Sequence, residues 1–178
     1  MNKKIKILLM IVFIAGVTVI AVLFGLQEEV LPVGSKLPEI NLSSLNGKFE
    51  INTSNKPLMI MFFEPDCPHC EYEFEVMNKR IDQLNNINIY FVTTDKKYIQ
   101  DSFFSKWNNL ANKNSVVFAY IDEKEFKEKI GINITPVFLF YSSTGVLEDK
   151  ILGETKFDRL LQSIKKAGGA QHQQSGLN

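Results

Sequence analysis

The sequence has few cysteines and no excess of either charge, and both shortages exclude classes of protein. Only Cys67 and Cys70 are present, which excludes a disulfide-rich secreted scaffold and a zinc module held by four cysteines. Basic and acidic residues number 20 each, so no net positive charge indicates nucleic-acid binding. The 178 residues suit one domain with appendages, long enough to bury a core without disulfides.

The longest uncharged stretch lies near the N-terminus. Residues 1–6 carry three lysines, residues 7–26 carry no charge, and two glutamates follow shortly after. About 20 apolar residues match a hydrocarbon core roughly 30 Å thick, whereas a cleaved signal peptide has a shorter apolar stretch that ends in small residues. We therefore expect an uncleaved transmembrane signal anchor over 7–26, with a cleaved signal as the alternative. The lysines predict that residues 1–6 are cytoplasmic and that the rest of the chain is extracytoplasmic.

Apolar patterning after this stretch predicts an α/β fold. Alternating residues on both sides of Asn46-Gly47 indicate a β-hairpin within residues 38–51, since Asn-Gly suits a tight hairpin turn. Continuous apolar runs predict buried strands, and apolar residues three or four apart predict helices. The expected elements are strand 58–63, helix 70–84, strand 87–93, helix 103–110, strand 116–121, helix 123–130, strands 137–141 and 146–152, and helix 157–164. This order predicts an α/β sandwich on a mixed central sheet flanked by helices.

Two further segments are expected to lack regular structure. Residues 27–36 contain a proline and a glycine that discourage regular structure, so we interpret them as a linker. Residues 167–178 carry no charge and have little to bury, so we expect a disordered tail.

Both cysteines belong to the motif Cys67-Pro68-His69-Cys70, between a buried strand and an amphipathic helix. Unpaired N–H groups and the helix dipole at a helix N-terminus stabilise a thiolate. Pro68 suits the first helical turn, where its missing N–H costs nothing, and His69 adds a donor and a possible positive charge. Each stabiliser lowers the thiol pKa and makes the disulfide more oxidising. The motif therefore predicts a redox-active pair.

Other uses of the two thiols remain open at this point. With His69 and the tail residue His172 they could bind a metal, so a copper-delivery or copper-binding module is the alternative function. A tail histidine is a poor structural ligand, and we expect neither a resident metal nor a cofactor. Peroxide reduction ranks lowest, because a peroxidatic cysteine normally has no partner two residues away.

From about residue 33 to residue 166 the chain resembles the thioredoxin fold, and specifically the membrane-anchored TlpA/ResA-like thiol–disulfide oxidoreductases of bacterial envelopes. The resemblance rests on residues 62–70 (FFEPDCPHC), on the additional N-terminal hairpin, and on Ile134-Thr135-Pro136 before a strand. It implies a thioredoxin-like domain over residues 37–166. It also implies a cis Thr135–Pro136 peptide that faces the disulfide, with the Thr135 backbone offered to an extended substrate segment.

Three acidic residues near the motif are candidates for tuning the thiols. Glu73 matches an acid that this family often carries, and it could tune the thiols or take a proton from Cys70; a solvated glutamate is the alternative. Glu64 and Asp66 bring negative charge near the thiols, which would raise the thiol pKa values and oppose His69.

The expected reaction is disulfide exchange with protein substrates. The Cys67 thiolate attacks a substrate disulfide, and Cys70 resolves the mixed disulfide. Pro-His between the cysteines resembles strong envelope oxidants. The short segment between the second and third strands of the predicted domain instead favours a reductase-like enzyme. The resemblance implies protein thiol or disulfide substrates and a membrane or envelope electron donor or acceptor.

Overall fold

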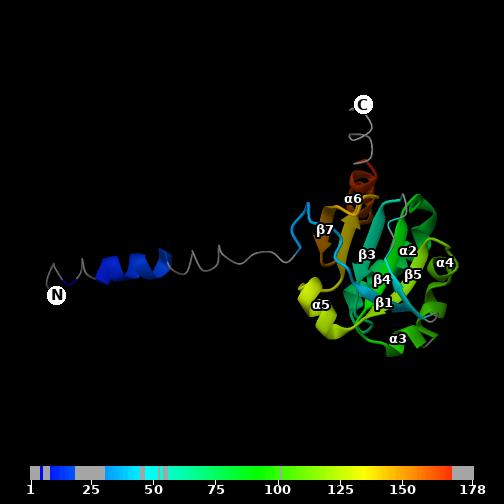
Figure 1. Cartoon of the computed structure of the whole chain (residues 1–178), viewed down its shortest axis with the longest axis horizontal. Coiled ribbons are helices and arrows are strands. Elements are labelled where there is room, and N and C mark those ends of the chain that lie inside the picture. The colour runs from blue at the N-terminus through cyan, green and yellow to red at the C-terminus, as the bar shows by residue number, and fades with distance from the viewer. Residues whose placement is uncertain are drawn as a thin grey trace. The chain divides into compact units, whose positions relative to one another are not determined.

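The computed structural model describes residues 5, 9–18, 31–44, 47–51, 53, 56–100 and 102–169. By its internal contacts the chain divides into two units, Met1–Val30 and Leu31–Asn178. Within the first unit residues 9–18 form a helix, and the second unit contains a seven-stranded sheet with helices on both faces (Figure 1).

The fold predicted for the N-terminal segment is corrected by the structure. Residues 9–18 are helical, and at about 1.5 Å per residue such a helix is only about half as long as a hydrocarbon core is thick. Among the described residues, no helix has both the length and the apolar character that a membrane span requires. The prediction of one transmembrane helix over residues 7–26 is therefore wrong as part of the fold. Its basis was the uncharged length of residues 7–26 together with the charged residues on either side. Residues 1–4, 6–8 and 19–30, which include the first four residues of the predicted linker, lie outside the described residues.

The sheet is mixed, as the strand pattern predicts. Its order is β2-β1-β5-β4-β3-β6-β7. The three central strands β5, β4 and β3 are parallel, and β6 runs antiparallel to β3. The strands are β1 (Asn41–Ser44), β2 (Gly47–Glu50), β3 (Leu58–Phe62), β4 (Asn88–Thr93), β5 (Val116–Ile121), β6 (Val137–Tyr141) and β7 (Leu147–Leu152). Helical crossovers join the parallel strands, which is the usual way to connect them.

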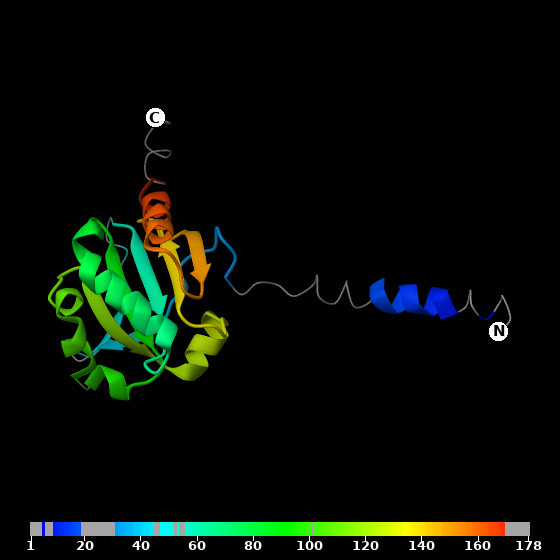
Figure 2. The same cartoon turned by 180° about the vertical axis from the view of Figure 1, so that it is seen from behind.

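In the described part of the second unit, seven helical segments accompany the sheet. They are α2 (Pro68–Arg80), η1 (Ile81–Gln83), α3 (Lys97–Gln100), η2 (Ser102–Trp107), α4 (Asn108–Ala111), α5 (Glu123–Lys129) and α6 (Phe157–Gly169). Seen from behind, α2 lies across one face of the sheet (Figure 2). The helix predicted for residues 103–110 is instead a 3-10 turn followed by a short α-helix. The last helix continues to Gly169 because Ala167 is fully buried, and residues 170–178 lie outside the described residues.

Two apolar clusters cover the two faces of the sheet. In β3, Met59 and Met61 face the cluster that contains α2, while Ile60 and Phe62 face the cluster that contains part of α5. This alternation explains why β3 is apolar at every position. Phe74 of α2 is fully buried and packs against the rings of Phe63, Phe91 and Trp107, with centroids 4.9, 4.8 and 5.6 Å away. Burial of Trp107 confirms that this residue belongs to the core.

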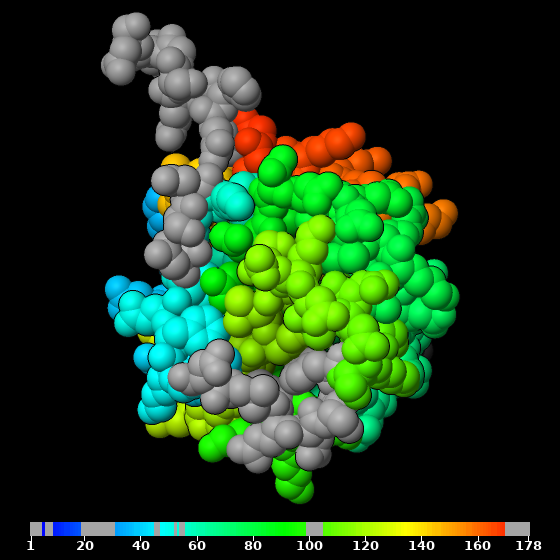
Figure 3. All heavy atoms as spheres, turned by 90° about the vertical axis from the view of Figure 1, so that its right-hand side faces the viewer, coloured from blue at the N-terminus to red at the C-terminus, as the bar shows by residue number. Residues whose placement is uncertain are grey.

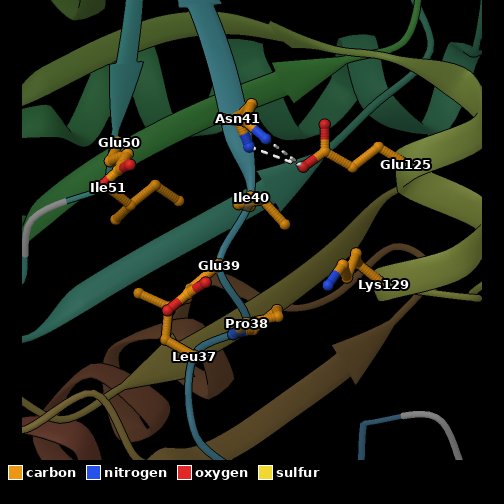
Figure 4. A pocket seen from close by; sticks show the side chains of 9 residues that line it. All are labelled: Leu37, Pro38, Glu39, Ile40, Asn41, Glu50, Ile51, Glu125 and Lys129. Atoms are coloured by element: carbon orange, nitrogen blue, oxygen red, sulfur yellow. Dashed lines mark hydrogen bonds between the residues drawn. The ribbon is translucent and has the colours of Figure 1, made fainter.

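The predicted N-terminal hairpin is confirmed. β1 pairs antiparallel with β2 and also with β5, so the hairpin extends the sheet at one edge. Figure 3 shows the hairpin (cyan) on the surface beside the chain that includes β5 (yellow-green). Glu125 of α5 accepts hydrogen bonds from the backbone N–H and the side-chain amide of Asn41, at 2.8 and 3.1 Å (Figure 4). These bonds attach the hairpin to α5.

Candidate active site

Cys67 occupies the N-cap of α2, directly after the loop that leaves β3. Its backbone is extended (φ −90°, ψ 113°), and Pro68 follows in the first helical turn. The Cys67 N–H donates to the carbonyl oxygen of Glu64 at 3.2 Å. The Cys67 sulfur accepts a hydrogen bond from the Cys70 backbone N–H at 3.4 Å. The sulfur thus takes the place of a capping oxygen at the positive end of the helix dipole.

Cys70 lies one turn further along α2 and faces the core. Both thiols are free, and Cys70 is 1% exposed whereas Cys67 is partly exposed. Burial raises the pKa of the Cys70 thiol to about 12, and the adjacent Cys67 adds to this increase. Partial burial also opposes ionisation of Cys67. Hydrogen bonds from the Cys70 thiol and backbone N–H outweigh this effect and lower the pKa of Cys67. Cys67 is therefore the thiol that ionises more readily.

The reduced protein should titrate its two thiols in well-separated steps. We expect one thiolate to form below the ordinary cysteine pKa of 9.0 and the second only near pH 12, because burial acts mainly on Cys70. Thiolate absorbance in the ultraviolet measures both steps. A Cys67→Ala variant should lose the first step and keep the second. Two thiolates that appear together near pH 9 would contradict the asymmetry.

The loop before β6 contacts the reactive thiol. The Thr135–Pro136 peptide is cis, as the resemblance to the thioredoxin fold implied. The Cys67 thiol donates to the carbonyl oxygen of Thr135 over 3.8 Å, and Pro136 is buried. Gly153, just after β7, donates its N–H to the Pro136 carbonyl oxygen at 2.8 Å and has a φ of +83°, which favours glycine. The end of β7 thus holds this loop beside Cys67.

His69 is paired with a residue that the sequence analysis did not find. Its Nδ1 atom lies 2.7 Å from the Oε2 atom of Glu154, and both side chains are exposed. Glu154 follows β7, so it is 85 residues away from His69 in the chain. The spacing of residues in the sequence could not have indicated this contact. It forms only because pairing with β6 places β7, and so the segment after it, close to the start of α2. The pair joins the start of α2 to the segment after β7.

Glu73 is buried, which excludes the alternative of a solvated side chain. It is 1% exposed, and its Oε1 atom accepts a hydrogen bond from the Thr155 backbone N–H at 2.6 Å. Burial raises the pKa of Glu73 to about 7. The bond from Thr155 opposes this shift, and the charge of Glu154 adds to it. A carboxyl group one helical turn from Cys70 can therefore exchange a proton near neutral pH.

Glu64 and Asp66 flank the thiols from the loop after β3, and both are exposed. Asp66 accepts a hydrogen bond from the Tyr98 hydroxyl at 2.8 Å. Glu64 contributes its carbonyl oxygen to the Cys67 N–H and its side chain to the edge of a pocket that Thr135 also lines. The structure thus brings all the predicted site residues to one end of the sheet.

A metal centre receives no support from the described part of the chain. There, no group of three or more histidine, cysteine, aspartate or glutamate side chains is arranged to hold a metal ion. His172, the residue proposed as a further ligand, lies outside the described residues.

Several solved structures share this fold. A peroxiredoxin-like protein from Aquifex aeolicus has a TM-score of 0.64 at 17% identity, over 78% of this chain and 88% of that protein. A protein assigned as the thiol:disulfide interchange protein DsbE from Chlorobium tepidum also scores 0.64, at 18% identity over 77% and 98%. A secreted disulfide oxidoreductase from Mycobacterium tuberculosis, homologous to E. coli DsbE, scores 0.55 at 19% identity over 71% and 95%. The comparison with curated proteins finds no match.

A family model matches most of the domain. Residues 49–168 match the model of the thioredoxin-like domain, a range that runs from β2 to α6 and contains both cysteines. Together with the thiol pair at the start of α2, this match confirms the expected enzyme class, a thiol–disulfide oxidoreductase. The chain belongs to the thioredoxin-like domain family.

Proposed function

We propose that this enzyme reduces disulfides in protein substrates, as a member of the TlpA/ResA-like group. The observation that carries the proposal is the asymmetry of the thiols: Cys67 is partly exposed with a lowered pKa, whereas Cys70 is buried with a raised pKa. One thiol is thereby suited to attack, and the other stays protonated until it is needed.

The reaction takes two exchange steps. The Cys67 thiolate attacks one sulfur of a substrate disulfide, a bond forms between the two sulfurs, and the other substrate sulfur leaves as a thiolate. Cys70 then loses its proton and attacks the Cys67 sulfur, which releases the second substrate thiolate. The substrate gains two electrons and the enzyme ends with a Cys67–Cys70 disulfide. Glu73, buried one turn from Cys70, accepts the Cys70 proton.

Exposed apolar side chains beside the thiols support a protein as the substrate. Ile134 is 47% exposed and Leu152 is 51% exposed, next to the loop that contacts Cys67. The Ile134 side chain lies about 4.0 Å from the position that a Cβ atom on Gly153, the residue after Leu152, would occupy, so the segments that carry Ile134 and Leu152 are neighbours. Exposed apolar patches of this kind commonly mark sites of protein contact. The Thr135 backbone, at the edge of the patch, is placed to pair with an extended segment.

The acids around the motif favour reduction over oxidation. We infer that Glu64 and Asp66, exposed on the loop before Cys67, oppose the lowering of the Cys67 pKa by charge repulsion and keep the disulfide from becoming strongly oxidising. An external dithiol reductant must then regenerate the reduced enzyme, and we place this donor in the cell envelope. The similarity to a secreted disulfide oxidoreductase supports an extracytoplasmic site of action, where substrate disulfides persist.

Equilibration of the full chain with glutathione buffers tests this direction. The ratio of reduced to oxidised enzyme gives its reduction potential. We expect a value closer to the roughly −270 mV of thioredoxin than to the roughly −120 mV of a strong envelope oxidant. A Glu64→Gln/Asp66→Asn variant should shift the potential upward, because the thiolate loses two repelling charges. A wild-type value near −120 mV would contradict reductase function.

A further inference from the structure

A small pocket opens beside the contact between Cys67 and Thr135. Thr135 lines it, and the carbonyl oxygen of the same residue lies 3.8 Å from the Cys67 sulfur. The apolar wall of the pocket consists of Phe62, Phe126 and Ile132. The Phe62 and Phe126 rings pack together with centroids 5.0 Å apart, so this wall belongs to the core of the α5 face. The pocket therefore has a rigid apolar side within reach of the reactive sulfur.

The size of the pocket limits what it can bind. Its volume is about 210 Å³, below the roughly 300–1,000 Å³ of typical sites for drug-sized ligands and cofactors. Thr94 and Asn133 supply the polar groups at its edge. A space of this size suits a single side chain presented by a larger partner.

The charged residues around the pocket also limit which side chains a bound partner can place beside it. Glu123 and Lys127 also line the pocket, but they pair with each other at 2.6 Å and so neutralise one another. Glu64 has no ion-pair partner among the described residues and is exposed. The end of the pocket nearest the thiols is therefore negatively charged. A lysine or arginine of the occupant would complement it.

We propose that this pocket, which we call the flanking pocket, receives an apolar side chain of the protein substrate and selects a basic residue beside it. This inference rests on the proposed function and names the class of substrate segment. An extended chain advances about 3.3 Å per residue. Since Thr135 both lines the pocket and contacts Cys67, the apolar residue lies within about three positions of the substrate cysteine. Glu64 then faces the lysine or arginine of the same segment.

Peptide disulfides test the flanking pocket directly. Each short peptide carries one cysteine joined to thionitrobenzoate. Attack by the Cys67 thiolate joins its sulfur to the peptide sulfur and releases the coloured thiolate. Leucine or serine occupies one position within three residues of the cysteine, and a neighbouring position carries lysine or glutamate. The full chain should react about tenfold faster with leucine than with serine at one of these positions, the usual effect of an apolar contact.

Matched variants separate the pocket from the thiols. Ile132→Ala should reduce the leucine-to-serine rate ratio toward one. Ile51→Ala, which shortens a partly buried isoleucine packed on the same core cluster outside this pocket, should keep the ratio. Glu64→Gln should remove the preference for lysine over glutamate without any change in the core. Because each readout is a ratio of two rates, a change in Cys67 reactivity cancels.

The outcomes distinguish the two proposals. Equal rates for leucine and serine peptides in the wild-type chain would overturn the flanking pocket and leave disulfide exchange intact. The same loss of selectivity in Ile132→Ala and Ile51→Ala would also overturn it. A chain that attacks none of the peptides, with both thiols free, would instead contradict the proposed function.

Discussion

Replacing Cys70 with alanine should give a protein that accumulates mixed disulfides with its substrates. Cys67 remains at the helix N-terminus with its backbone hydrogen bond from position 70, so it can still attack. Without the Cys70 thiol no second exchange releases the substrate, and the covalent complex persists. Non-reducing electrophoresis followed by mass spectrometry measures the complexes, which should disappear when dithiothreitol is added.

The matching substitution Cys67→Ala is the control for this result. The remaining thiol is 1% exposed and has a pKa near 12, so it should capture almost no substrate and show almost no exchange. Comparable trapping by the two variants would contradict the assignment of Cys67 as the attacking thiol.

The buried carboxyl group of Glu73 should make stability fall as the pH rises. Burial raises its pKa from 4.5 to about 7 in the folded protein. Between these values the folded state binds more protons than the unfolded state, so the free energy of unfolding decreases with pH. The total loss is about 3 kcal/mol, complete above pH 7 and absent below about pH 4.5. Urea unfolding of the oxidised protein at several pH values measures this effect.

Glu73→Gln is the matched variant for this prediction. Glutamine keeps an oxygen that can accept the hydrogen bond from the Thr155 N–H, but it cannot ionise. The variant should therefore be more stable than the wild type above pH 7, and the difference should shrink at pH 5. In the trapping and exchange reactions it should slow the resolving step more than the first attack. A wild-type pH profile that matches the variant would show that Glu73 does not titrate in this range.

The sheet could be predicted because apolar residues mark its strands directly. β3 and β6 are apolar throughout, since both of their faces are covered. The turn Ser142–Gly145 separates β6 from β7 and marks where β7 follows. The motif Cys67–Cys70 also follows from local sequence, because the two thiols and the helix start are neighbours in the chain. These features could be predicted because residues close together in the sequence determine them.

Features that depend on distant contacts could not be predicted in this way. Glu154 reaches His69, and Thr155 reaches Glu73, only because β7 returns the chain to the start of α2. The flanking pocket likewise combines the end of β3, α5 and the loop before β6. The composition of residues 7–26 predicted a helix long enough to cross a membrane. The described residues contain no helix of that length and apolar character.

The most direct test of the central claim is a single-turnover reaction between the reduced full chain and a protein disulfide. The account predicts that each enzyme reduces one disulfide and itself loses two hydrogen atoms, with the new bond located between Cys67 and Cys70 by peptide mass mapping. Reduced enzyme that leaves the protein disulfide intact, or that becomes oxidised without a Cys67–Cys70 bond, would contradict it.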